Sequence, residues 1–96
     1  MPTYHIPGKW RRREVRSDRD VTEVLDYVSN SAELSLQDVS YELLNVEIGE
    51  VLWRGPHHKY EVAKDEKRKA TRNAKNGYSP DSLKLYIEIK PEQNPD

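Results

Sequence analysis

The sequence predicts an α+β fold, with a small, mainly antiparallel sheet of three to four strands and two helices packed on one face. Apolar side chains recur every three or four residues over 20–30, which is the period of an amphipathic helix. Residues 63–76 combine high helix propensity with an absence of Gly and Pro. Residues 83–89 alternate between apolar and polar side chains, as a half-buried strand does. The 96 residues contain no linker, so one domain spanning 1–96 is expected.

The N-terminal segment shows no periodic pattern. Residues 1–8 contain two prolines and a glycine and predict a flexible tail, as do residues 91–96 at the other end, with two further prolines. Residues 9–16, KWRRREVR, are too polar for a strand to be assigned. No element is therefore assigned before residue 20.

The first helix is predicted over about 20–30. Asp20 is the expected N-cap, and Glu23, three residues later, resembles the second member of a capping box. Residues 29–31, Ser-Asn-Ser, end the element. One face of the helix is apolar and is expected to face the core: Val21, Val24, Leu25 and Val28.

Residues 35–44 allow two interpretations. A helix would place four apolar side chains on one side, namely Leu36, Val39, Leu43 and Leu44. A strand is favoured because the β-branched and aromatic content is high. The apolar alternation over 39–43 resumes in the opposite phase over 44–48. Such a slip predicts a β-bulge at Leu43/Leu44.

The following residues predict a hairpin and a third short strand. Gly49 and Glu50 fit a two-residue turn before a strand over 51–53. A second turn is predicted over 54–57, because it contains Gly and Pro, and a strand over 58–62. The basic helix follows over 63–76, and Gly77 is its expected C-terminal stop.

Charge is strongly segregated along the chain, although the formal net charge is only −1. Residues 9–19 carry six basic and two acidic side chains, whereas residues 20–53 carry eight acidic side chains and no Lys or Arg. Residues 54–79 carry eight basic and three acidic side chains. Segregation of this kind bears on binding partners more than on the fold.

The basic helix presents two distinct faces. Three alanines, Ala63, Ala70 and Ala74, form a narrow stripe suited to packing against the sheet. Within about 80° on another side lies a row of cations that can follow a phosphate backbone. This row is Lys64, Arg68, Arg72 and Lys75. The alternative is a solvated face, partly neutralised by Asp65 and Glu66.

The N-terminal basic run is a second candidate site. Trp10 would stack on a base, and Arg11, Arg12 and Arg13 would contact phosphates, as basic arms often do. The alternative is a disordered arm, or an edge strand whose tryptophan packs on the core. Both interpretations remain open at this point.

Catalytic and metal-binding motifs are not found. The chain has no Cys, which excludes disulfides and thiolate ligands, and His57 and His58 would point to opposite faces of an extended segment. No glycine-rich phosphate loop or nucleophile elbow occurs. No metal, no cofactor and no enzyme activity are therefore predicted, with a weak nuclease using His57 or His58 as the third hypothesis.

The leading hypothesis is a small non-enzymatic module that binds nucleic acid through the basic helix and the N-terminal arm. The alternative is a protein-interaction or regulatory module that uses its segregated acidic and basic surfaces, and a homodimer is compatible with it. No apolar run approaches the roughly 18 residues of a membrane-spanning helix. No membrane partner is therefore expected, and the expected location is cytoplasmic.

Overall fold

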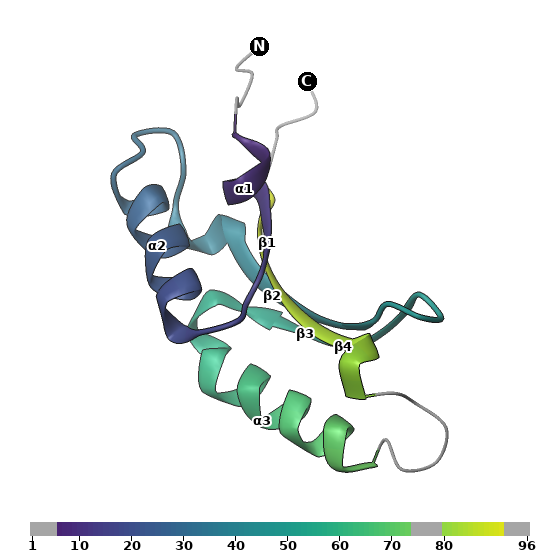
Figure 1. The fold of residues 1–96 in the computed structure, drawn as a ribbon. Coiled ribbons are helices and arrows are strands. Elements are labelled where there is room, and N and C mark those ends of the chain that lie inside the picture. The colour runs from purple at the N-terminus through teal and green to yellow at the C-terminus, as the bar shows by residue number, and fades with distance from the viewer. Residues whose placement is uncertain (1–5, 74–79, 92–96) are drawn as a thin grey trace.

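The computed structural model describes residues 6–73 and 80–91. Within them, four strands form one antiparallel sheet in the order β1-β4-β2-β3 (Figure 1). The strands are β1 (Arg12–Glu14), β2 (Val39–Asn45), β3 (Glu50–Pro56) and β4 (Leu83–Ile89). The α-helices are α1 (Gly8–Arg11), α2 (Asp18–Ser29) and α3 (Tyr60–Arg72). Single turns of 3-10 helix are η1 (Leu36–Asp38), η2 (His57–Lys59) and η4 (Pro80–Ser82).

One face of this sheet carries the core. Alternate residues of the two central strands, among them Tyr41 and Ile87, are buried there against apolar side chains of α2 and α3. Val24 of α2, Ala63 of α3 and Ile87 of β4 are each 0% exposed. The arrangement confirms the predicted α+β class with two helices on one face of a mainly antiparallel sheet. It also confirms the strand predicted over 83–89.

Two crossovers place the helices side by side. Strands β1 and β2 are each antiparallel to β4, so they run in the same direction, and α2 connects them on the core face. Strands β3 and β4 are each antiparallel to β2, and α3 connects them on the same face. In Figure 1 the start of α2 therefore lies close to the start of α3. This juxtaposition creates the groove described below.

Helix α2 confirms the helix predicted over 20–30, but it begins two residues earlier. Ser17 is the N-cap, and Asp20 is the third residue of the helix rather than its cap. The Asp20 carboxylate accepts hydrogen bonds from the backbone N–H groups of Arg16 at 2.8 Å and Ser17 at 3.1 Å. The capping box is therefore formed by Ser17 and Asp20, one turn before the predicted pair.

Residues 39–45 form a strand, as the favoured interpretation predicted. The register shifts at Leu43/Leu44, which confirms the predicted position of the irregularity. Leu43 lies opposite Trp53 and Leu44 lies opposite Val51, so Leu52 of β3 is the extra residue. Pairing of β2 with β4 is regular throughout, so Leu44 remains in phase with the rest of β2.

The hairpin between β2 and β3 has a longer turn than predicted. Asn45 pairs with Glu50, so the turn comprises the four residues between them rather than Gly49 and Glu50. The side-chain oxygen of Asn45 accepts a hydrogen bond from the Glu47 N–H at 3.0 Å. The backbone carbonyl of Asn45 accepts a second one from the Gly49 N–H at 2.8 Å. Gly49 has φ +72°, a conformation that glycine adopts without steric cost. Val46 and Ile48, expected in a strand, are exposed turn residues.

The short strand predicted over 58–62 does not exist, and the turn predicted over 54–57 is wrong as well. Strand β3 continues to Pro56, η2 follows, and α3 begins at Tyr60. The physical reason is packing: the Tyr60 ring stacks on Tyr41 of β2 with 5.7 Å between ring centroids, and Ala63, one turn later, is fully buried. A helix brings both side chains to the sheet, whereas an alternating strand would not.

The basic helix is confirmed in position but starts three residues before the predicted residue 63. Ala63 is buried and Ala70 packs against the core, as the alanine stripe predicted. Ala74, Lys75 and Gly77 lie outside the described residues. None of the described helices is long and apolar enough to cross a lipid bilayer.

The basic run before α2 forms a short helix that was not predicted and an edge strand that was one of the alternatives. Helix α1 leads into β1, which pairs with β4 at the edge of the sheet, with Arg12 opposite Glu88. Most of the predicted tails, 1–5 and 92–96, lies outside the described residues. Within the described part, Ile6 is only 7% exposed and belongs to the core cluster, so the packed body begins before residue 8.

Candidate functional site

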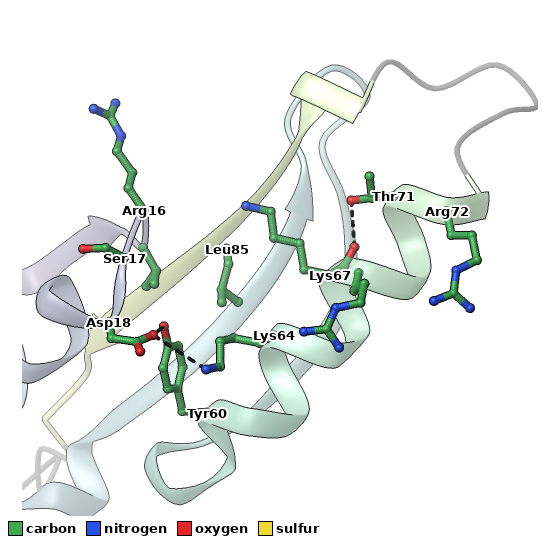
Figure 2. Close-up of a pocket in the computed structure, with 11 residues that line it drawn as sticks. Arg16, Ser17, Asp18, Tyr60, Lys64, Lys67, Thr71, Arg72 and Leu85 are labelled. Atoms are coloured by element: carbon green, nitrogen blue, oxygen red, sulfur yellow. Dashed lines mark hydrogen bonds and ion pairs between the residues drawn. The ribbon is translucent and has the colours of Figure 1, made fainter.

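A groove with a cavity of about 560 Å³ lies between α3 and the segment that joins β1 to α2 (Figure 2). Its floor is apolar and includes Val15 and Leu85, two residues of the core cluster. Figure 2 shows Leu85 between the two walls. We call this feature the cationic groove, because five basic side chains line it: Arg16, Lys64, Lys67, Arg68 and Arg72.

Helical periodicity explains how α3 contributes four of these cations. Residues at spacings of three and four lie on one side of a helix, and Lys64, Lys67 and Arg68 are spaced in this way. Arg72 continues the row one turn later, next to Thr71, which also lines the groove. Ala63 is buried and Ala70 packs against the core, and these contacts fix the rotation of α3 so that the row of cations faces the groove.

One end of the cationic groove is closed by interactions within the chain. The Tyr60 hydroxyl donates a hydrogen bond to Asp18 Oδ1 at 2.7 Å, and Lys64 Nζ lies 3.6 Å from the same carboxylate (Figure 2). Lys64 also pairs with Glu61 at 3.2 Å and lies 4.7 Å from the centroid of the Tyr60 ring. The Tyr60 hydrogen bond and Lys64 lower the pKa of Asp18, so this carboxylate stays ionised at neutral pH and balances Lys64.

The opposite end of the groove carries unbalanced positive charge. Arg68 pairs with Asp65 at 3.0 Å, in an exposed i,i+3 contact. Lys67 and Arg72 form no ion pair with any residue that the structure describes. The Thr71 hydroxyl donates to the backbone carbonyl of Lys67 at 2.8 Å, so it does not engage the lysine ammonium. An anion entering the groove therefore meets its strongest attraction near Lys67 and Arg72.

Arg16 stands on the other wall of the cationic groove. Its side chain is 80% exposed, and its guanidinium lies 3.4 Å from Glu14. Figure 2 shows this side chain extending away from α3, so its charge lies at the rim. At the start of α2 next to it, the capping box of Ser17 and Asp20 engages the backbone N–H groups of these two residues.

Trp10 and Arg13 lie outside the cationic groove and contact the chain's own residues. The Trp10 ring stacks on Tyr27 of α2 with 5.0 Å between centroids and an interplanar angle of 10°, and it packs against the core. Arg13 forms ion pairs with Asp20 at 3.0 Å and Glu23 at 2.9 Å. These contacts correspond to the alternative of an edge strand whose tryptophan packs on the core.

Arg12 lies on the sheet face that α2 and α3 leave uncovered, because strand neighbours alternate between faces. It forms an ion pair with Glu42 at 3.3 Å, and its guanidinium stacks over the Tyr86 ring at 4.2 Å. Arg54 of β3 pairs with the same Glu42 at 3.0 Å. Arg11 and Arg12 line a different, smaller cavity of about 390 Å³. The structure therefore does not bring Arg11, Arg12 or Arg13 together with the α3 row.

The histidines occupy a different environment from the one expected. His57 and His58 belong to η2 rather than to an extended segment, and their rings meet edge to face with 5.3 Å between centroids. Neither lines the cationic groove. Among residues 6–73 and 80–91, no three His, Cys, Asp or Glu side chains are grouped so as to hold a metal ion.

Of the predicted site residues, Lys64, Arg68 and Arg72 therefore share one groove, whereas Lys75 lies outside the described part of the chain. Lys67 was not included in the predicted row, although its spacing of three from Lys64 would have assigned it to the same side of the helix. No local sequence pattern indicated that Arg16 or the apolar floor would belong to the site. Comparison of the chain with known protein families, with characterised proteins and with solved structures found no match.

Proposed function

We propose that the protein binds nucleic acid through the cationic groove, with the basic side chains of α3 contacting phosphates. The observation that carries this proposal is the row of four α3 cations along one concave surface, Lys64, Lys67, Arg68 and Arg72, with Arg16 at its rim. Lysine and arginine at phosphates supply the sequence-independent part of nucleic-acid affinity by releasing condensed counterions. Because the cations line a concave surface, ligand binding is favoured over the alternative of a helix face that is only solvated.

The length of the row is suited to a phosphate backbone. From Lys64 to Arg72 the helix rises by roughly 12 Å, at about 1.5 Å per residue. Each strand of a nucleic-acid duplex carries one charge per about 3.4 Å of axis. The row can therefore follow several consecutive phosphates of one strand, with the strongest contacts expected at Lys67 and Arg72.

The proposal assigns no nucleic-acid contact to Trp10 or Arg13, because the ring of one and the guanidinium of the other are engaged with α2. A contact of Arg11 and Arg12 with nucleic acid, separate from the groove, stays a prediction. The alternative, a protein-interaction module built on segregated charge, is favoured less. Part of the predicted acidic surface is occupied by cations of the same chain, as in the Arg13–Asp20 and Arg54–Glu42 pairs.

The test is a charge-reversed double variant, Lys67→Glu with Arg72→Glu. The fold should be retained, because glutamate has high helix propensity and neither side chain is fully buried. Affinity for labelled RNA or DNA, measured by fluorescence anisotropy, should fall for every sequence tested. The slope of log affinity against log salt should flatten by about one to two units, as expected for two lost phosphate contacts.

The matched control is Lys9→Glu with Lys59→Glu. Both lysines are exposed and lie outside the cationic groove, and the pair changes the net charge by the same amount. Affinity reduced equally by both double variants would mean that net charge, not the groove, governs binding. Absence of binding by the wild-type protein at low salt would overturn the proposal, and the protein-interaction alternative would then lead.

A further inference from the structure

The cationic groove is polarised along its length. Asp18, Tyr60 and Lys64 form a balanced cluster at one end, and Lys67 and Arg72 leave the other end positive. Between the two ends the floor is closed by the side chains of Val15 and Leu85, which are only 6% and 2% exposed. A complementary ligand has an anionic group, an apolar or aromatic middle and a hydrogen-bond donor at its far end.

The size of the groove admits more than a phosphate. Its volume of about 560 Å³ falls within the roughly 300–1,000 Å³ typical of pockets that enclose small molecules. A duplex presents phosphates on its outside and keeps its bases stacked within, so it would leave an apolar floor unused. The unstacked bases of a single strand are free to turn toward apolar or aromatic surfaces of a protein.

Resting on the proposed function, we infer that the groove binds a nucleotide unit of a single strand, with the phosphate at Lys67 and Arg72 and the base over Val15 and Leu85. The Asp18 carboxylate, which accepts hydrogen bonds only, then faces the N–H groups of the base or a ribose hydroxyl. Ionised Asp18 disfavours a second phosphate at this end, which fixes the direction of the nucleotide in the groove.

Tyr60 orders the groove and is not the surface on which the base stacks. Its ring packs against Tyr41 with 5.7 Å between centroids, and Lys64 Nζ lies 4.7 Å from its centroid. Its hydroxyl is committed to Asp18. The base is therefore expected to contact the aliphatic floor, and the methyl groups of Val15 and Leu85 become direct reporters of it.

The first test compares a short labelled RNA strand with the blunt duplex of the same sequence at low salt. The single strand should bind about tenfold more tightly, which corresponds to roughly 55 Å² of apolar surface removed from water at about 25 cal/mol per Å². Equal affinity, or tighter binding of the duplex, would overturn this inference and leave nucleic-acid binding itself intact. Failure of both ligands to bind would overturn the proposed function as well.

The second test follows the methyl resonances of Val15 and Leu85 by NMR, with Ile48 in the β2–β3 turn as the control methyl. The single strand should move the Val15 and Leu85 resonances upfield, because a base ring then lies over them, whereas inorganic phosphate should not. Unchanged resonances at saturation with the strand would overturn the placement of the base. A mononucleotide bound as tightly as the strand would overturn the assignment to a polymer and make a free nucleotide the ligand.

Discussion

The Tyr60 hydroxyl donates a hydrogen bond of 2.7 Å to the Asp18 carboxylate, and this contact joins the first residue of α3 to the first residue of α2. The two residues are 42 positions apart in the sequence. The contact closes one end of the cationic groove and spans its two walls at that point (Figure 2). The packing of two helices thus determines the shape of the candidate site.

Replacing Tyr60 by Phe should raise the pKa of Asp18, because the hydroxyl hydrogen bond is the largest cause of its lowering. The pKa of Asp18 in the folded protein lies below the ordinary aspartate value of 3.8, so its contribution to stability is present above that pH and is lost as the pH falls through the folded pKa. The variant should therefore lose less stability on acidification. An NMR titration of the side-chain carboxyl measures the shift, and Tyr27→Phe is the control. An unchanged pKa in Tyr60→Phe would contradict the contact.

Replacing Asp20 by Ala should destabilise the protein by about 1 kcal/mol, because two backbone N–H groups lose their acceptor at the start of α2. The hydrogen bond from the Arg16 N–H is the largest cause of the lowered pKa of Asp20. The difference from wild type should therefore shrink as the pH falls below about 4. Urea unfolding at several pH values measures it, with Asp26→Ala in the same helix as the control. A constant difference across this range would argue against the capping role.

Replacing Tyr41 by Phe should change the unfolding free energy at neutral pH by less than about 1 kcal/mol, because the buried hydroxyl has no hydrogen-bond partner among the described residues. Burial raises the pKa of Tyr41 to about 12. The unfolded chain releases this proton near pH 10, so wild-type stability falls between pH 10 and about 12. The variant should show a shallower alkaline decline in urea unfolding. Parallel declines for both proteins would show that the hydroxyl is not held in an apolar site.

Replacing Gly55 by Ala should destabilise the protein by about 1–3 kcal/mol, because the added Cβ would overlap the ring of Trp53 on the same strand. The effect should shrink in a Trp53→Leu background, where the ring is removed, and thermal unfolding of the four proteins gives the coupling energy. Gly8→Ala is the control, since a Cβ there meets no atom within 4 Å. Additive effects of the two substitutions would place the Trp53 ring elsewhere.

Replacing Ile87 by Ala should cost about 2–5 kcal/mol, because this side chain is fully buried at the centre of the core face. Lys84→Ala, on the other face of the same strand, should cost less than about 1 kcal/mol, since its ion pair with Glu14 is partly exposed. Thermal and urea unfolding compare the two variants. Similar losses in both would reverse the assignment of the two faces of β4.

The sequence by itself determined the elements whose signal is a local period. Amphipathic helices and half-buried strands repeat their apolar residues every 3.6 or 2 positions, so α2 and β4 could be recognised from neighbours in the chain. Helix α3 followed from helix propensity, and β2 was favoured over a helix because of its β-branched and aromatic content. The register shift lies at the predicted Leu43/Leu44, but its extra residue is Leu52 of β3, and the change of phase that predicted it came from turn residues 46–48. The row that contains Lys64, Arg68 and Arg72 is a property of one helix, and it too followed from spacing.

Only the tertiary structure decided the elements and contacts that depend on distant residues. Strand β1 exists because the polar segment 12–14 pairs with β4, and Tyr60 enters a helix because its ring packs on Tyr41. The cationic groove requires Arg16 and Val15 to meet α3 across two crossovers. Such contacts join residues far apart in the sequence, and their free energy comes from burial and pairing that no local period encodes. The cations of the site could thus be predicted from the sequence of one helix. The concave shape of the groove, its apolar floor and its closed end depend on how distant segments pack in the fold.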